Sequence, residues 1–362
     1  MSDHLSMLEV GGVVVKVFLH AIIGDEEALS FMWNIKGSSG IVPCAVVCCV
    51  VNKPYHGDVE RGIRSLAERS ENIVSITCSD TSRFGLKTDN DVWSMIDNLV
   101  ASQAHLPTPR FKEMQQRTGF NYQPDSLLFD VELRPYVHPA TNNRFDPMHV
   151  IFSNGILGLE VMLFLRSARK AHGMYFAQVR AHFAETQWTS PKSRQGQCDF
   201  QGCFSEAKEA SSNDFLKVGA SDLLAVYPAF RHFVVEASSG SASLKREMDS
   251  LLLLLEVCDL IKAALRHPLA NRVRQLAAKL GQTAALYVEA FKLAYGEGMV
   301  RVKHHELLHL AAQLLLDGLL LACWAMERKH IKAKQAFDHY MHQLQLHKGA
   351  LARLVNTQVL FL

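Results

Sequence analysis

The feature that most constrains the fold is a nearly unbroken helical pattern over the last third of the chain. From Leu244 onward, apolar residues recur every three or four positions, which is the spacing of an amphipathic helix. This spacing predicts helices over Leu244–Leu265, Leu269–Tyr295, His304–Met326 and a last one from Glu327 through Leu354. We therefore expect a large helical C-terminal region.

Strand-like runs are concentrated near the start of the chain. Val13–Ile23 is rich in β-branched residues and predicts a strand, and Ile41–Val51 predicts a second, shorter one. Between them, Glu26–Ile35 has helical spacing and is followed by a turn of Gly and Ser residues. The expected fold class is therefore an α-rich mixed α/β fold.

Changes in composition divide the chain into four regions. Residues 1–54 hold the predicted strands and a Cys-containing turn, and residues 55–145 form an irregular mixed insert. Residues 146–236 are mostly helical, with a polar loop at 186–214, and residues 237–362 form the C-terminal helical domain. Within the insert, the stretch from Leu106 to Asn143 is rich in Pro and turn residues and has little periodicity.

The overall charge gives no indication of nucleic-acid binding. The chain has 38 Lys and Arg against 36 Asp and Glu, a net charge of +2. Contact with DNA would need a local basic patch, because neutralisation of phosphates dominates such affinity. The eight Cys include the adjacent pair Cys48 and Cys49, which is unlike a secreted disulfide framework. We therefore expect an intracellular protein that is not secreted.

One segment has the length of a membrane-spanning helix. Leu307–Met326 is strongly apolar, but it contains His309, Gln313 and a central Asp317. An Asp at that depth is costly in a bilayer. We expect a buried helix of a soluble protein here, and no membrane partner.

The segment from His305 to His309 matches HExxH, the signature of zinc metallopeptidases. On a helix, His305 and His309 lie one turn apart and can share a Zn²⁺, while Glu306 can polarise a metal-bound water. Glu327 is then available as a third ligand. Since the chain has 17 His, the motif also arises readily by chance.

Cysteines near the N-terminus offer a second set of possible zinc ligands. Cys44, Cys48 and Cys49 follow Pro43 with the spacing C-x3-C-C, which differs from the regular C-x2-C of a half zinc site. A buried thiol cluster is the alternative. The candidate metal ligands in the chain are Cys44, Cys49, His305 and His309.

Two acids occupy positions that suit metal binding. Asp25 comes directly after the predicted strand and Gly24, where many mixed sheets place metal-binding carboxylates. Asp146 and His149 stand three residues apart at the start of a predicted helix over Asp146–His172, so their side chains face the same side. The ordinary alternative for each acid is to cap its helix.

These segments follow one another in a recognisable order. They are Gly24–Leu29, the turn Lys36–Gly40, Pro43 with Cys44, Cys48 and Cys49, Phe145–His149 with Asn154, Gly155, Ile156 and Glu160, Lys303–Leu310 with Gly318, and Glu327–His330. The series resembles eukaryotic DDE transposases of the CACTA-like and Plavaka-like group. The resemblance covers the chain from about Gly24 to Lys334.

The resemblance implies an RNase H-like core and an ancestral Mg²⁺-dependent cleavage and transfer of DNA strands. It makes Asp25 the second catalytic acid, Asp146 and His149 the D-x-x-H box, and Glu327 the terminal catalytic Glu. DNA is then the expected partner and the nucleus the expected location. The basic residues that would contact DNA are Arg328, Lys329, Lys332 and Lys334.

The chain also departs from the family pattern. The first catalytic acid of the family lies on a strand well upstream of the second. Here 24 residues precede Asp25, and we expect neither of the acids among them, Asp3 and Glu9, to stand on a strand with room for the preceding hairpin. We therefore expect a partial RNase H-like core that has lost Mg²⁺ and catalysis. Binding of DNA or protein would remain, and exposed sheet edges would favour self-association.

Two other hypotheses remain open beside the transposase remnant. One is a zinc metallopeptidase that uses the HELLH motif at 305–309. The other is a helical protein-interaction scaffold without an active site. The sequence indicates no small-molecule substrate for any of the three.

Overall fold

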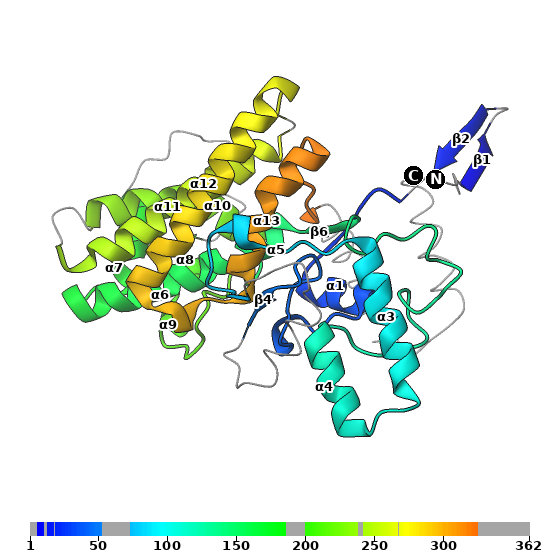
Figure 1. Cartoon of the computed structure of the whole chain (residues 1–362). Helices are drawn as coiled ribbons and strands as arrows, with labels where there is room; N and C mark the ends of the chain where they lie inside the picture. The colour runs from blue at the N-terminus through cyan, green and yellow to red at the C-terminus, as the bar shows by residue number, and fades with distance from the viewer. Residues whose placement is uncertain are drawn as a thin grey trace, which may run out of the picture. The chain divides into compact units, whose positions relative to one another are not determined.

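A computed structural model of the chain describes residues 6–10, 13–17, 19–52, 73–185, 200–237, 242–266 and 268–324. The chain forms two compact units, Met1–Leu321 and Ala322–Leu362, and every helix and strand named below lies in the first unit. Most described residues are helical, and the strands are few and short (Figure 1). The α-rich mixed α/β class is therefore confirmed, and the finer division into four regions stays a prediction.

The described strands form three separate pairs. β1 (Ser6–Val10) and β2 (Val13–Val17) make an antiparallel hairpin, whereas β3 (Ile22–Gly24) is parallel to β6 (Asn143–Phe145), and β4 (Val50–Val51) is parallel to β5 (Val74–Ser75). Glu9 therefore stands on β1, the first strand of this hairpin.

The single strand predicted over Val13–Ile23 is wrong, because the chain leaves the extended ladder between β2 and β3. The carbonyls of Leu19 and His20 accept hydrogen bonds from the side-chain amide of Asn142, at 3.1 and 2.9 Å, instead of pairing with a strand. The second predicted strand, Ile41–Val51, is reduced to the two residues of β4.

β6 pairs with β3 in register, with Ile22 opposite Asn143 and Gly24 opposite Phe145. No pattern in the sequence indicated β6, because three residues are too few to establish a period. The stretch from Leu106 to Asn143, in which little periodicity was found, contains α4 (Thr108–Thr118). Its sequence, TPRFKEMQQRT, is polar, and Thr118 is its only residue classed as buried. A helix with so little buried surface leaves no apolar pattern to read.

Two helices of the N-terminal half begin with side-chain caps. α1 (Glu26–Trp33) is capped by Asp25, whose Oδ1 accepts the backbone N–H of Ala28 at 2.6 Å. α3 (Asp89–Gln103) starts with a capping box between Thr88 and Asp91. Both caps satisfy backbone donors that the first turn leaves unpaired.

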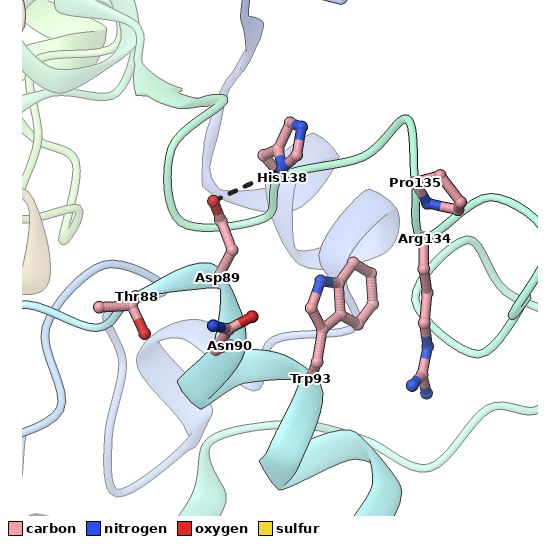
Figure 2. A pocket seen from close by; sticks show the side chains of 7 residues that line it. All are labelled: Thr88, Asp89, Asn90, Trp93, Arg134, Pro135 and His138. Carbon is pink, nitrogen blue, oxygen red and sulfur yellow. Dashed lines mark ion pairs between the residues drawn. The ribbon is translucent and has the colours of Figure 1, made fainter. Parts of the chain in front are cut away.

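The N-terminal turn of α3 lines an open pocket of about 540 Å³ (Figure 2). Arg134 lies over the ring of Trp93 at 5.1 Å, and His138 lies 3.6 Å from the carboxylate of Asp89. Asp89 also accepts the backbone N–H of Ala140 at 2.8 Å. These contacts tie the segment after α4 to α3. The residues that line the pocket are not among the acids and thiols considered below.

The helix predicted over Asp146–His172 is two helices, α5 (Pro147–Ile151) and α6 (Ile156–His172). Asn154 adopts a positive φ of 47°, and a Cβ at Gly155 would lie 2.3 Å from the backbone of Ile151. The chain therefore turns sharply between the two helices, and only Gly fits at position 155.

By length and composition, one described helical stretch, Pro147–His172, could cross a membrane. In its apolar window 78% of the residues are buried inside the protein, and core helices of soluble proteins pass the same test. The segment Leu307–Met326, which the sequence singled out for its length, does not form one helix, because α13 (Val302–Asp317) ends at Gly318 with φ 74°. The predicted helix His304–Met326 is therefore too long.

Between α6 and the C-terminal helices, the described residues include three short or medium helices. They are α7 (Phe176–Glu185), α8 (Phe200–Cys203) and α9 (Glu206–Glu209). The last two occupy part of the predicted polar loop 186–214, and residues 186–199 lie outside the described part of the chain.

The remaining helices are α10 (Ala220–Ala237), α11 (Lys245–Ala264), α12 (Ala270–Tyr295) and α13. In this order each packs against the next, and α11 also packs against α6 (Figure 1). The predicted helices Leu244–Leu265 and Leu269–Tyr295 are confirmed to within a residue at each end. Long apolar faces fixed these two helices, since burial of such faces stabilises them.

A buried carboxyl lies within this helical core. Glu160 on α6 is fully buried, and the hydroxyl of Ser250 on α11 donates to its Oε1 at 2.6 Å. Burial raises the pKa of Glu160 to about 8, and the hydrogen bond from Ser250 only partly offsets this. The side chain is therefore a neutral acid at neutral pH.

We expect the free energy of unfolding to fall as the pH rises from about 4.5 to about 8. In that window the unfolded chain has lost the proton of Glu160 while the folded chain retains it, so the slope approaches about 1.4 kcal/mol per pH unit. Urea unfolding at several pH values measures this slope. Glu160→Gln should lower the slope by this amount and leave the contribution of Glu306, whose pKa burial also raises to about 8. Glu132→Gln, at an exposed carboxylate, should leave the slope unchanged. An equal slope in wild type and Glu160→Gln contradicts the assignment.

Candidate functional site

The parallel pairing of β3 with β6 brings two acids together. Asp25 is the first residue after β3, and Asp146 is the first residue after β6. Each also caps the helix that follows, since Asp146 Oδ1 accepts the backbone N–H of Met148 at 3.1 Å. Adjacent parallel strands end at one edge of a sheet, so the two carboxylates lie on the same side.

His149 on α5 lies between the two carboxylates. Its Nδ1 is 2.5 Å from Oδ2 of Asp146, and its Nε2 is 3.8 Å from Oδ2 of Asp25. The side chain of Asp146 is fully buried, and that of Asp25 is 37% exposed. Three of the residues selected from the sequence thus form one row that runs from the interior to the surface.

Lys303 on α13 supplies a positive charge beside this row. Its ammonium donates to the backbone carbonyls of His149, Ser153 and Asn154 at 3.0, 3.2 and 3.0 Å. These bonds tie α13 to the turn between α5 and α6. Burial lowers the pKa of Lys303, while neighbouring acids, Glu306 foremost, oppose that effect.

Glu306 is a further acid near this centre that the transposase pattern did not select. It is buried, and burial together with the charge of Glu26 raises its pKa to about 8, against the opposing effect of Lys303. Asp25 is also among the charges that act on it. Glu306 is therefore an uncharged acid at neutral pH. Its place on the same helical turn as Lys303 is the signal that could have indicated it.

α13 is fixed against β6 by side chains that replace a neighbouring strand. The amide of Gln313 accepts the N–H of Phe145 and donates to its carbonyl, both at 3.1 Å. One residue along, the guanidinium of Arg144 binds both carboxylate oxygens of Asp317, at 2.6 and 2.9 Å. This bidentate pair is almost fully buried.

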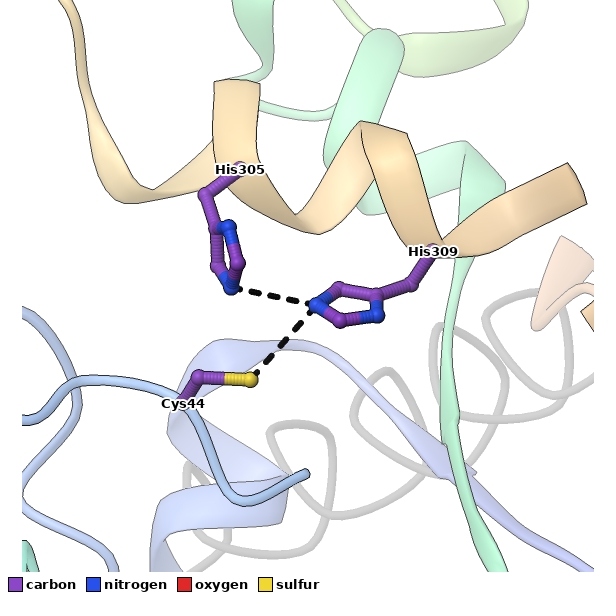
Figure 3. A group of neighbouring side chains, drawn as sticks. All are labelled: Cys44, His305 and His309. Atoms are coloured by element: carbon purple, nitrogen blue, oxygen red, sulfur yellow. Dashed lines mark hydrogen bonds between the residues drawn. The ribbon is translucent and has the colours of Figure 1, made fainter. Parts of the chain in front are cut away.

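A second cluster lies on another face of α13, where His305 and His309 point toward Cys44 (Figure 3). The Nε2 atoms of the two imidazoles are 3.0 Å apart, and Cys44 Sγ is 3.6 Å from Nε2 of His309. All three side chains are buried. Among the residues that the structure describes, none forms a hydrogen bond with Nδ1 of His305.

These separations fit the donor set of a zinc ion. With Zn–S of about 2.3 Å and Zn–N of about 2.0–2.1 Å, tetrahedral ligands stand about 3.6 Å (S to N) and about 3.3 Å (N to N) apart. The observed 3.6 and 3.0 Å are close to those values. One thiol and two imidazoles are also ligands that Zn²⁺ prefers.

The cluster is enclosed by aromatic rings. Phe84 lies edge-on to His305 at 4.9 Å between centroids, and Phe145 stacks on His309 at 5.1 Å. Lys87 donates its buried ammonium to the carbonyl of Cys44 at 2.9 Å. The surroundings hold the three ligand side chains in place and leave them out of contact with solvent.

Burial alters the proton affinity of each ligand in the zinc-free protein. It raises the pKa of Cys44 to about 11, although Lys87 opposes this rise. It lowers the pKa of His309 to about 4 and that of His305 well below its ordinary value, the latter with help from His309. At neutral pH the imidazoles are therefore neutral and the thiol is protonated.

Other predicted site residues are placed differently. Cys49 lies apart from the cluster, because its Sγ accepts the N–H of Gly85 at 3.0 Å and donates to the carbonyl of Arg83 at 3.4 Å. Cys48 donates to the carbonyl of Gly85 at 3.2 Å. The remaining predicted residues, Glu327, Arg328, Lys329, Lys332 and Lys334, lie outside the described part of the chain.

No family model and no curated protein sequence matches this chain. Its chemistry has to be argued from the two clusters themselves.

If zinc occupies the cluster, its binding at Cys44 must release a proton, because the metal takes the thiolate. The imidazoles are already neutral and release none. We therefore expect the association constant for Zn²⁺ to rise about tenfold per pH unit between about pH 6 and pH 9.

Competition with a chelator of known pH dependence measures this slope. Cys44→Ala should lower the affinity and flatten the slope, and Cys48→Ala should change neither. A slope of two or more protons, or a wild-type slope that survives in Cys44→Ala, contradicts the assignment.

Proposed function

We propose that this chain descends from a DDE transposase and now binds DNA beside one divalent cation held by Asp25 and Asp146, without cutting the DNA. The observation that carries this proposal is the position of both acids at the ends of adjacent parallel strands. RNase H-like nucleases use carboxylates on neighbouring strands to hold metal ions at the scissile phosphate.

The order of the motifs supports the same ancestry. Asp25, the second acid of the resemblance, and Asp146, the acid of the D-x-x-H box, are 121 positions apart in the sequence. Their carboxylates nevertheless contact the two nitrogens of the same imidazole, that of His149. A chance match of two short motifs would not require this convergence. An RNase H-like core is the ancestral fold that we infer from it.

The state of Asp146 argues against two-metal catalysis. Its Oδ1 caps α5 and its Oδ2 contacts His149, so both oxygens already have hydrogen-bond partners. Lys303 adds a positive charge to the same region. Two Mg²⁺ ions about 4 Å apart need several free carboxylate oxygens. These contacts favour one ion between Asp25 and Asp146. We therefore propose that one divalent-cation position is kept, whereas the missing first acid led us to expect the loss of Mg²⁺.

We expect the full chain to bind one Mn²⁺ that Mg²⁺ displaces, measured by the loss of the free-ion electron paramagnetic resonance signal. Asp25→Asn and Asp146→Asn should each weaken Mn²⁺ binding by more than about tenfold, because loss of a direct ligand lowers metal affinity more than loss of a supporting contact does. Glu27→Gln, an exposed carboxylate on α1 near Asp25, is the matched control and should bind as wild type does.

The same protein preparations test the absence of cleavage. Supercoiled plasmid incubated with Mg²⁺ or Mn²⁺ should stay intact, while binding to the DNA should weaken steeply with salt. Metal-dependent nicking that Asp25→Asn abolishes would overturn the inactive part of the proposal. Mn²⁺ binding that neither Asp variant affects would overturn the acid pair itself.

We also propose that Zn²⁺ at Cys44, His305 and His309 has a structural role and joins α13 to the N-terminal region. The enclosed position of the cluster supports this over a metallopeptidase, because a hydrolytic zinc keeps an open position for water and substrate. Glu306, the presumed catalytic acid of the HExxH hypothesis, has Glu26 and Lys303 as its strongest charged neighbours. The charges that act on Glu306 therefore come from the carboxylate centre, although Glu306 itself also acts on Cys44.

A C-x2-C that starts at Cys44 would place its second thiol at position 47, where this chain has the buried Val47. We expect Val47→Cys to supply a fourth ligand and tighten zinc binding, since structural zinc sites have four ligands. Replacement of zinc by Co²⁺ measures this, because each added thiolate strengthens the charge-transfer absorption.

Val46→Cys adds a thiol at the neighbouring position and should leave the cobalt spectrum unchanged. A spectrum that is the same in Val47→Cys and wild type would contradict the expectation that a thiol at position 47 completes the three-ligand site. A cobalt spectrum that persists in Cys44→Ala would contradict the zinc site as a whole.

A further inference from the structure

A third group of potential ligands lies on other helices, where α7 packs against α10. His182 belongs to α7, and His232 and Glu236 stand four residues apart on α10, so they share one helix face. One donor atom from each residue falls within 4.8 Å of the other two. Nothing in the sequence motifs pointed to this group.

The contacts among the three side chains are close. His182 Nε2 is 3.1 Å from His232 Nδ1, and each imidazole has its other nitrogen 3.4 Å from an oxygen of Glu236. The rings are 5.1 Å apart and tilted by 33°. Small side-chain rotations would therefore turn one nitrogen of each ring and one carboxylate oxygen toward a common point.

We propose that His182, His232 and Glu236 form a second Zn²⁺ site, which links α7 to α10. Two imidazoles and one carboxylate are an established donor set for zinc, with water in the remaining position. The two nitrogen donors favour zinc and related transition metals over Mg²⁺ or Ca²⁺, which prefer oxygen.

The location favours a cation independently of the donor set. His182 lies in the last turn of α7, and Glu236 is the residue before the last in α10. Carbonyl groups at the C-terminal end of a helix carry a partial negative charge that attracts cations. The ends of two helices therefore add to the charge of the carboxylate.

Accessibility distinguishes this site from the buried cluster at Cys44. The side chain of His182 is 15% exposed, and those of His232 and Glu236 are 50% and 59% exposed. Zinc can therefore enter from solvent without opening the core. Packing of His182 against Phe233 at 5.4 Å holds one ligand while the other two adjust.

The test uses the full chain with Cys44→Ala and Asp25→Asn, so that both other proposed metal sites are removed. We expect this protein to bind one equivalent of Zn²⁺ by isothermal titration, and X-ray absorption should report nitrogen and oxygen ligands without sulfur. Adding His232→Ala or His182→Ala should weaken binding by more than about tenfold. His105→Ala removes an exposed imidazole elsewhere and should have no effect.

Because His232 is exposed, its replacement should leave the fold intact, and circular dichroism checks this. Equal zinc affinity in the protein with Cys44→Ala and Asp25→Asn, with and without His232→Ala, would overturn the proposal, as would sulfur ligation. The proposal does not depend on the transposase ancestry or on the cluster at Cys44. If the single change Cys44→Ala abolishes all zinc binding, the result supports the buried site at Cys44. The same result refutes the site at His182, His232 and Glu236.

Discussion

The arrangement of the candidate site depends on three residue pairs between β3 and β6. Their parallel pairing joins the segment around residue 24 to the segment around residue 145 and sets Asp25 beside Asp146. So short a ladder has few backbone hydrogen bonds of its own. Asn142 secures one end by binding the carbonyls before β3, and Gln313 covers the open side of β6. Polar side chains thus do for this edge what additional strands do in a larger sheet.

α13 connects the clusters because its successive faces have different partners. Lys303 and Glu306 lie toward the carboxylate centre, while His305 and His309, one turn apart, meet Cys44. Further along, Gln313 binds the backbone of β6. With 3.6 residues per turn, a single helix can serve these partners without a kink. The HExxH pattern is therefore two patterns in one segment, since its His pair and its Glu belong to different environments.

How much the sequence could predict depended on the type of signal. Long apolar faces predicted α11 and α12 closely, and the Asp-Pro start at Asp146 predicted a helix cap, because both signals are local. β6 and α4 escaped prediction, since one is too short and the other too polar for periodicity. Of the candidate ligands, Cys44, His305 and His309 converge while Cys49 does not, because irregular backbone after Cys44 turns Cys49 toward Gly85. The surface group on α7 and α10 depends on packing between helices, which no motif records.

The most direct test of this account is the position of a bound divalent cation in crystals of the full chain soaked in MnCl₂. Anomalous scattering at the manganese edge locates the ion without any assumption about activity. The account predicts one peak between the carboxylates of Asp25 and Asp146, with His149 displaced or turned to admit it. A manganese peak at other acids, with none between these two, would contradict the claim that the strand pair preserves a metal-binding centre.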